Sequence, residues 1–163
     1  MEIRQATVQD LPVMMDLFEG ARRFMVSQGN PNQWTGGYPS EEMVLSDIES
    51  GHAYVCEQGN VVVGTFVYII GKDPTYAVIY EGSWPDEKPY GVIHRLAGKA
   101  GCHGVAVACI DWGLRQCPVM RIDTHANNMV MRNLLLKYGF SYCGIIHLEQ
   151  GRGERLAFHI CKE

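Results

Sequence analysis

A chain of 163 residues can bury a substantial core, and 47% hydrophobic with 20% charged residues is a globular composition. The net charge of −4 gives no electrostatic reason to expect nucleic acid as a partner, because phosphate backbones bind to basic surfaces. No apolar run approaches the roughly 20 residues of a membrane span, and the N-terminus lacks a signal-peptide pattern. We therefore expect one domain, residues 1–163, in the cytoplasm without a membrane partner, and a homodimer remains possible.

The first third of the chain predicts a strand followed by two helices. Residues 2–6 have the length and pattern of a short opening strand. The pattern Thr7-x-x-Asp10 resembles a capping box with Asp in place of Glu, and it predicts a helix that begins near Asp10. Ser40 is a typical N-cap for a second helix, which we expect to begin near Glu41.

The segment between these two helices, residues 27–39, is rich in Gly, Asn and Pro and carries Trp34 and Tyr38. Loops on a rigid scaffold often carry recognition residues. The two aromatic side chains are therefore either walls of a binding cleft or simple core anchors.

Two further strands are expected at residues 53–56 and 61–70, joined by a hairpin turn at 58–60. The β-branched and aromatic segment 75–80 is either another strand or part of a long loop. The same insertion carries Trp84, a further candidate for the substrate side of a cleft. The strand count stays open at this point.

From Val92 onward the elements alternate in βαβαβ order, which indicates an α/β fold with a mostly parallel centre to its sheet. These elements are a strand from Val92, a helix near Gly104, a strand at 120–124, a helix near Met129 and a strand at 140–148. A turn at 150–153 and a strand at 156–161 then complete a closing hairpin.

The glycine-rich loop before the first of these helices reads Gly101-Cys102-His103-Gly104-Val105-Ala106. Small residues leave the amides of a helix N-terminus open, and the helix dipole adds positive potential, so this is a backbone seat for phosphate. A nucleotide-hydrolase loop would need Ser or Thr at Ala100, and the dinucleotide fingerprint lacks its first Gly-x-Gly pair. The loop instead resembles the pyrophosphate loop of the GNAT superfamily of acyl-CoA-dependent N-acyltransferases, Gln/Arg-x-x-Gly-x-Gly/Ala, with Gly101 at the Gln/Arg position.

A second segment strengthens this resemblance. Residues 128–140 resemble the family's segment of Asn, an Ala-like residue, Leu-Tyr and then Gly-Phe, and they follow the loop after one helix and one strand. The resemblance is strongest over residues 90–146. It implies a GNAT-type α/β fold, with a central mixed, twisted sheet flanked by about four helices.

The resemblance implies an N-acetyltransferase that moves an acetyl group from acetyl-CoA directly to a primary amine of a small molecule or peptide. The alternative is a non-catalytic CoA-binding module of the same fold. The residues implied to bind the co-substrate are Leu96, Ala97 and Gly98 for the pantetheine arm, Cys102, His103, Gly104, Val105 and Ala106 for the pyrophosphate, and Asn128.

Two residues, His94 and Tyr138, are candidates for proton transfer. The family usually places its acid, a Tyr, four residues before the Gly-Phe pair, where this chain has Leu135; Tyr138 lies one turn further on. His94 stands two residues before Leu96, so we expect it on the same face of the strand. Its imidazole suits a general base near neutral pH, although a hydrogen-bonded structural role is the other interpretation.

Asp123 and His125, at the end of the next strand, are candidates for binding the acceptor amine or for capping the following helix. A carboxylate is a simple means of recognising a cationic amine.

The six cysteines include no Cys-x-x-Cys pair, and no His pair has zinc spacing, so we expect reduced thiols and no metal. Cys102 beside His103 also allows a cysteine enzyme, although adjacent side chains diverge at a helix start.

Overall fold

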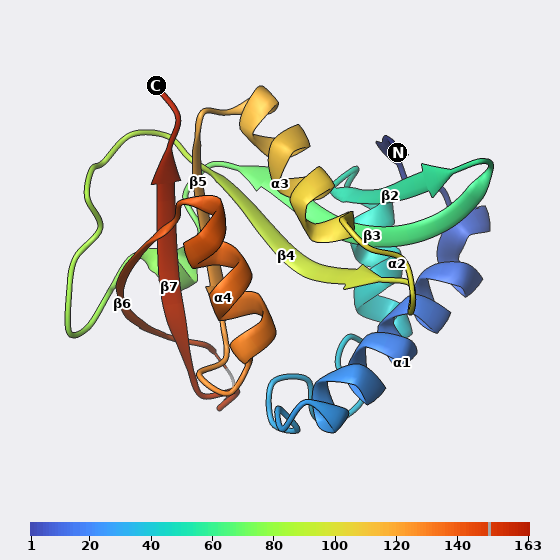
Figure 1. Cartoon of the computed structure of the whole chain (residues 1–163), viewed down its shortest axis with the longest axis horizontal. Coiled ribbons are helices and arrows are strands. Elements are labelled where there is room, and N and C mark those ends of the chain that lie inside the picture. The colour runs from blue at the N-terminus through green and yellow to red at the C-terminus, as the bar shows by residue number, and fades with distance from the viewer. Residues whose placement is uncertain (150) are drawn as a thin grey trace.

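The computed structural model describes residues 1–149 and 151–163 (Figure 1). Its helices and strands are, in chain order, β1 (Glu2–Gln5), α1 (Leu11–Ser27), α2 (Glu41–Glu49), β2 (Ala53–Gln58), β3 (Val61–Ile70), β4 (Gly91–Gly98), α3 (Val105–Gln116), β5 (Val119–Thr124), α4 (Met129–Tyr138), β6 (Ser141–His147) and β7 (Glu154–Cys161). All four helices begin within one residue of their predicted starts. In the described ranges, no helix is both long and apolar enough to cross a membrane.

The strands form one seven-stranded sheet in the order β1-β2-β3-β4-β5-β7-β6. The mixed sheet flanked by four helices confirms the predicted fold class. The prediction of a mostly parallel centre is wrong, because β4–β5 is the one parallel pair among the described strands. The closing hairpin folds back so that β7 takes the place beside β5, antiparallel to it. Of the turn predicted at 150–153, residue 150 lies outside the described residues.

Helices α1 and α2 cover one face of the sheet, and α3 and α4 cover the other (Figure 1). Val55 packs in a cluster with residues of α1 and α2, whereas its neighbour Cys56 packs in a second cluster with residues of α3 and α4. This is the alternation expected of a strand buried on both sides. We call these the α1/α2 face and the α3/α4 face.

Residues 71–90 form a long connection rather than a strand. Residues 74–76 form a turn of 3₁₀ helix, because the Asp73 carboxylate accepts the Thr75 amide at 2.9 Å and turns the chain there. Only Tyr80 forms an isolated bridge, to Ile145. Tyr76 of this connection packs in a third cluster with side chains of β4, β5, β6 and β7. Residues 75–80 are therefore part of a loop and do not form an extra strand.

The sheet opens between β4 and β5. The two strands pair only at Gly91–Met120 and Val92–Arg121 and then diverge (Figure 1). Past that point β4 remains paired with β3 on its other side, up to Gly98. The backbone of β4 from residue 93 onward therefore has one free hydrogen-bonding edge, and this edge faces the opening.

Candidate active site

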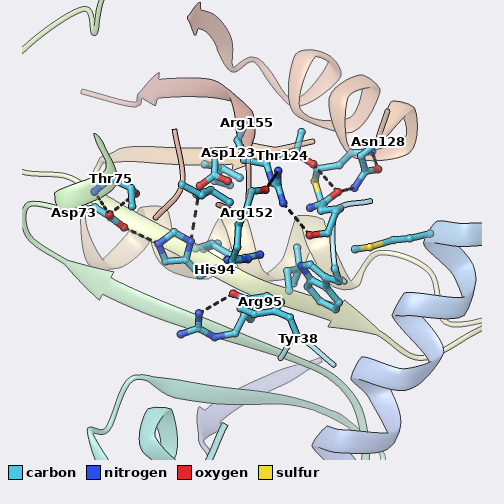
Figure 2. Close-up of a pocket in the computed structure, with 18 residues that line it drawn as sticks. Tyr38, Asp73, Thr75, His94, Arg95, Asp123, Thr124, Asn128, Arg152 and Arg155 are labelled. Atoms are coloured by element: carbon cyan, nitrogen blue, oxygen red, sulfur yellow. Dashed lines mark hydrogen bonds and ion pairs between the residues drawn. The ribbon is translucent and has the colours of Figure 1, made fainter. Parts of the chain in front are cut away.

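A cavity of about 230 Å³ lies where β4 and β5 diverge (Figure 2). It is lined by side chains from both faces of the sheet, because the opening interrupts the sheet at this point. The lining residues are Met25, Gln33, Trp34, Tyr38, Asp73, Thr75, Ile93, His94, Arg95, Leu96, Ile122, Asp123, Thr124, Asn128, Met131, Leu148, Arg152 and Arg155.

A β-bulge in β4 decides which side chains enter this cavity. Val67 of β3 pairs with His94, and Thr65 pairs with Ala97, so β4 contains one extra residue. Arg95 adopts a φ of 49° there, in the left-handed region that non-glycine residues rarely enter. Its guanidinium binds both carboxylate oxygens of Asp47 at 2.8 Å, and these two bonds tie the bulge to α2.

The bulge also corrects one prediction. We expected His94 to share a face with Leu96 because the two are separated by one residue. Leu96 instead packs with the α3/α4 cluster, whereas Ala97 packs with the α1/α2 cluster, because the extra residue shifts the alternation. His94 and Leu96 both line the cavity, but they reach it from opposite faces of the sheet.

His94 lies between two carboxylates. Its Nε2 is 2.7 Å from Oδ2 of Asp73, and its Nδ1 is 3.9 Å from Oδ2 of Asp123. The same oxygen of Asp123 accepts a hydrogen bond of 2.6 Å from the Tyr76 hydroxyl. Figure 2 shows the imidazole between the two acidic side chains, with a dashed line to each of them.

The protonation states follow from these contacts. Burial raises the pKa of Asp73, but hydrogen bonds from His94 and Thr75 outweigh it and lower the pKa to about 2. An ionised carboxylate only accepts, so Nε2 of His94 carries the hydrogen that it donates to Asp73. Burial, and then the charge of Asp123, raises the pKa of Tyr76, which keeps this hydroxyl a donor. A neutral His94 therefore presents the lone pair of Nδ1.

The hydrogen bond between Asp73 and His94 predicts that the difference in stability between the wild type and Asp73→Asn depends on pH. A folded pKa near 2, below the ordinary 3.8, stabilises the fold above pH 4 by about 2 kcal/mol, and this is lost as pH falls from 4 through 2. In urea unfolding, the wild type should exceed Asp73→Asn in stability at pH 5, and the gap should close toward pH 2. Asp16→Asn, at an exposed position, is the control that should show no such closing gap. A gap that is independent of pH would contradict the assigned ionisation of Asp73.

Two arginines enter the cavity near the β6–β7 connection (Figure 2). The guanidinium of Arg152 lies over the ring of Tyr38, 3.6 Å from its centroid. Arg155 is buried and donates to the backbone carbonyls of Gln33, Arg152 and Glu154. These contacts join the end of the sheet to the loop between α1 and α2.

The phosphate loop lies at the start of α3. Gly101 and Gly104 have φ values of 79° and 83°, and a Cβ at either position would meet no heavy atom within 4 Å. The amides of residues 103–107 have no acceptor within the described residues, since the first helical bond runs from the Ala108 amide to the Gly104 carbonyl. This loop is open and presents a row of free N–H groups, as an anion seat requires.

The cavity brings six of the predicted site residues together. His94, Leu96, Asn128 and Asp123 line the cavity, as do Trp34 and Tyr38 from the loop between α1 and α2. Asn128 also caps α4, because its Oδ1 accepts the Met131 amide at 3.0 Å.

Three of the predicted catalytic and substrate-binding residues lie outside the cavity. Trp84 packs on Tyr76 and donates to its carbonyl, so it anchors the long connection. The His125 ring accepts the Asn127 amide at 3.0 Å and so stabilises the turn before α4. Tyr138 hydrogen-bonds to Asp111 on α3, at the far end of α4 from the cavity, roughly 15 Å along the helix axis from Asn128.

A core residue, Leu135, occupies the position of the family's usual acid. Leu135 has an exposed fraction of 0% and belongs to the α3/α4 cluster. Cys102 and His103 lie in the phosphate loop, and neither lines the cavity. In the described part of the chain all six cysteines are free, and no cluster of side chains suits a metal ion.

Sequence reasoning missed Asp73, Arg95, Arg152 and Arg155. The long connection brings Asp73 to the site, and the bulge brings Arg95 there. No sequence motif marks either feature. The one available signal was Asp73-Pro74-Thr75, a typical turn sequence that also fixes a carboxylate.

Solved structures of acetyltransferases share this architecture. The chain is 33% identical to a GNAT-family acetyltransferase from Streptococcus agalactiae, with a TM-score of 0.87 over 99% of this chain and 95% of that one. Ard1 from Thermoplasma volcanium has a TM-score of 0.67 at 14% identity, over 99% and 97% of the two chains. The ribosomal-protein-S18-alanine N-acetyltransferase of Escherichia coli has a TM-score of 0.61 at 12% identity, over 99% and 94%. The last two likenesses concern the fold alone. No family model matches the chain, and a search of curated proteins found no match.

Proposed function

Because the chain belongs to the GNAT family of acetyltransferases, we propose that it transfers the acetyl group of acetyl-CoA directly to a primary amine. The observation that carries this proposal is the free edge of β4, which runs from the cavity toward the open amides of the α3 loop. We further propose that residues 1–163 form one domain of this type, since β1 and β7 belong to the same sheet.

Acetyl-CoA would approach from the α3/α4 face. The pantetheine arm is an extended chain with amide groups, and it would pair with the free backbone edge of β4 at Leu96, Ala97 and Gly98 as an added strand does. The pyrophosphate would accept hydrogen bonds from the amides of residues 103–106, and Cys102 borders that seat. Asn128 would reach the same arm from the start of α4.

The acceptor would approach from the α1/α2 face, where Trp34 and Tyr38 form a wall. An ammonium group would be held by Asp123, whose Oδ1 has no hydrogen-bond donor in the described residues. Nδ1 of His94 would take one proton from it, and Asp73 and Asp123 would stabilise the resulting imidazolium. The amine nitrogen then bonds to the acetyl carbon and the carbon–sulfur bond breaks. The nitrogen gives up its second proton to solvent, and the thiolate takes one proton from solvent.

Leu135 supports an alternative, a non-catalytic CoA-binding module of the same fold. Its buried position offers no side-chain acid for the departing thiolate. We favour catalysis because His94 is oriented by Asp73 with its lone pair toward the cavity, an arrangement that CoA binding alone does not need.

Two assays test this proposal. Isothermal titration calorimetry with acetyl-CoA should show one site per chain. A thiol-release assay with a panel of primary amines should then show turnover that depends on the amine. Binding without turnover for every amine would support the binding module, and absence of acetyl-CoA binding would contradict both functions.

A further inference from the structure

The charges of the cavity are separated into two groups. Asp73 and Asp123 flank His94 on the side of the long connection. Arg152 and Arg155 enter from the β6–β7 connection (Figure 2).

A third arginine in the cavity, Arg95, is already neutralised. Its guanidinium binds both oxygens of Asp47 at 2.8 Å, and it also donates to the Tyr38 hydroxyl at 3.0 Å. It holds the bulge and the wall of the cavity, and its positive charge is already balanced by Asp47.

Arg152 and Arg155 differ from Arg95 in this respect. Among the described residues neither forms an ion pair with a carboxylate. Arg152 is half-buried and stacked on Tyr38, which fixes its plane without using any of its five N–H donors. A guanidinium oriented in this way is suited to bind a carboxylate through two hydrogen bonds.

Arg155 adds a second positive charge beside it. Three of its five N–H donors bind backbone carbonyls, which leaves two donors without a partner in the described residues. Burial lowers the pKa of Arg155, Asp123 opposes that effect, and Arg152 adds to it. Two neighbouring cations that lack a carboxylate would be stabilised by a bound anion.

Resting on the proposed acetyl transfer, we propose that the acceptor is a small amino acid, with its ammonium at Asp123 and its carboxylate on Arg152, supported by Arg155. A zwitterion matches both charge groups of the cavity, whereas a simple amine would leave the two guanidiniums unpaired. The volume of about 230 Å³ suits a single amino acid, and Met25, Trp34 and Leu148 offer apolar surface for its side chain.

Loss of the positive charge on the acceptor nitrogen favours release of the product. The ammonium loses two protons overall, one through His94 to solvent and one that is matched by the proton taken up by the thiolate. The acetylated product keeps its carboxylate but no longer carries the positive charge that Asp123 would hold.

Acceptor discrimination tests the inference. The kcat/KM of the purified full-length protein is measured with each standard amino acid, its α-amide and the corresponding decarboxylated amine. For the preferred amino acid, kcat/KM should exceed that of its amide by roughly 10- to 100-fold, the range of a charge-assisted hydrogen bond. Arg152→Gln should bring this ratio close to one, mainly through a higher KM for the acid. Arg23→Gln, an exposed arginine on α1, should keep the wild-type ratio.

The following outcomes of these assays would overturn the inference. Equal use of acids and amides by the wild type, or a preference that survives Arg152→Gln, overturns the inference. Acetylation of decarboxylated amines with no acid accepted also overturns it and leaves the proposed acetyl transfer standing. Failure of all three compound classes together with absent acetyl-CoA binding overturns both.

Discussion

The Gly104→Glu variant is expected to bind acetyl-CoA roughly a thousandfold more weakly than the wild type. The new carboxylate would occupy the seat proposed for the pyrophosphate and repel it. A like-charge contact at ~4 Å costs on the order of 4 kcal/mol at the effective dielectric of a protein surface, and this corresponds to about three decades in affinity. Calorimetric titration with acetyl-CoA measures the loss.

The matched control for this charge is Gly104→Gln. Both substitutions place a side chain of the same size at a φ of 83°, so both carry the same backbone strain. Neither meets another heavy atom close to the Cβ, because that position is open to 4 Å. Gln should therefore weaken binding much less than Glu. If folded Gly104→Glu binds acetyl-CoA as the wild type does, the pyrophosphate does not bind to this loop.

The His94→Ala variant should lower kcat about 100-fold while the affinity for acetyl-CoA stays unchanged. The imidazole is oriented by Asp73 and presents Nδ1 to the cavity, so its removal takes away the proposed base without touching the proposed CoA edge of β4. The wild-type rate should rise with pH along one limb, as catalysis by a general base requires, and the variant should lack that limb.

His147→Ala is the matched control, since this exposed histidine lies outside the cavity on β6. It should keep both the rate and the pH profile. An unchanged profile in His94→Ala would make His94 a structural residue and transfer the role of base to Asp123 or an ordered water.

Caps, turns and loops that are determined by a few neighbouring residues were predicted correctly. The Ser40 hydroxyl accepts the Met43 amide at 3.2 Å, as its N-cap pattern indicated. Gly59 and Asn60 both adopt positive φ, as the hairpin prediction requires. The loop at 101–106 precedes α3 as expected, because glycine at these positions determines the backbone directly.

Features that depend on distant contacts were not predicted. Asp73 meets His94 across 21 residues, and nothing in either local sequence announces the pair. The bulge places a positive φ on Arg95, an arginine, and Asp47 on another element stabilises it. A period-2 pattern cannot reveal one extra residue in a strand, so the faces of His94 and Leu96 were assigned incorrectly.

The most direct test of the account is a crystal structure of the protein with CoA. We predict that the pantetheine arm pairs with the backbone of β4 from Leu96 to Gly98, with the diphosphate on the amides of residues 103–106. The thiol should then lie in the cavity beside His94. CoA density away from this edge and loop, or a thiol remote from His94, would contradict the proposed site.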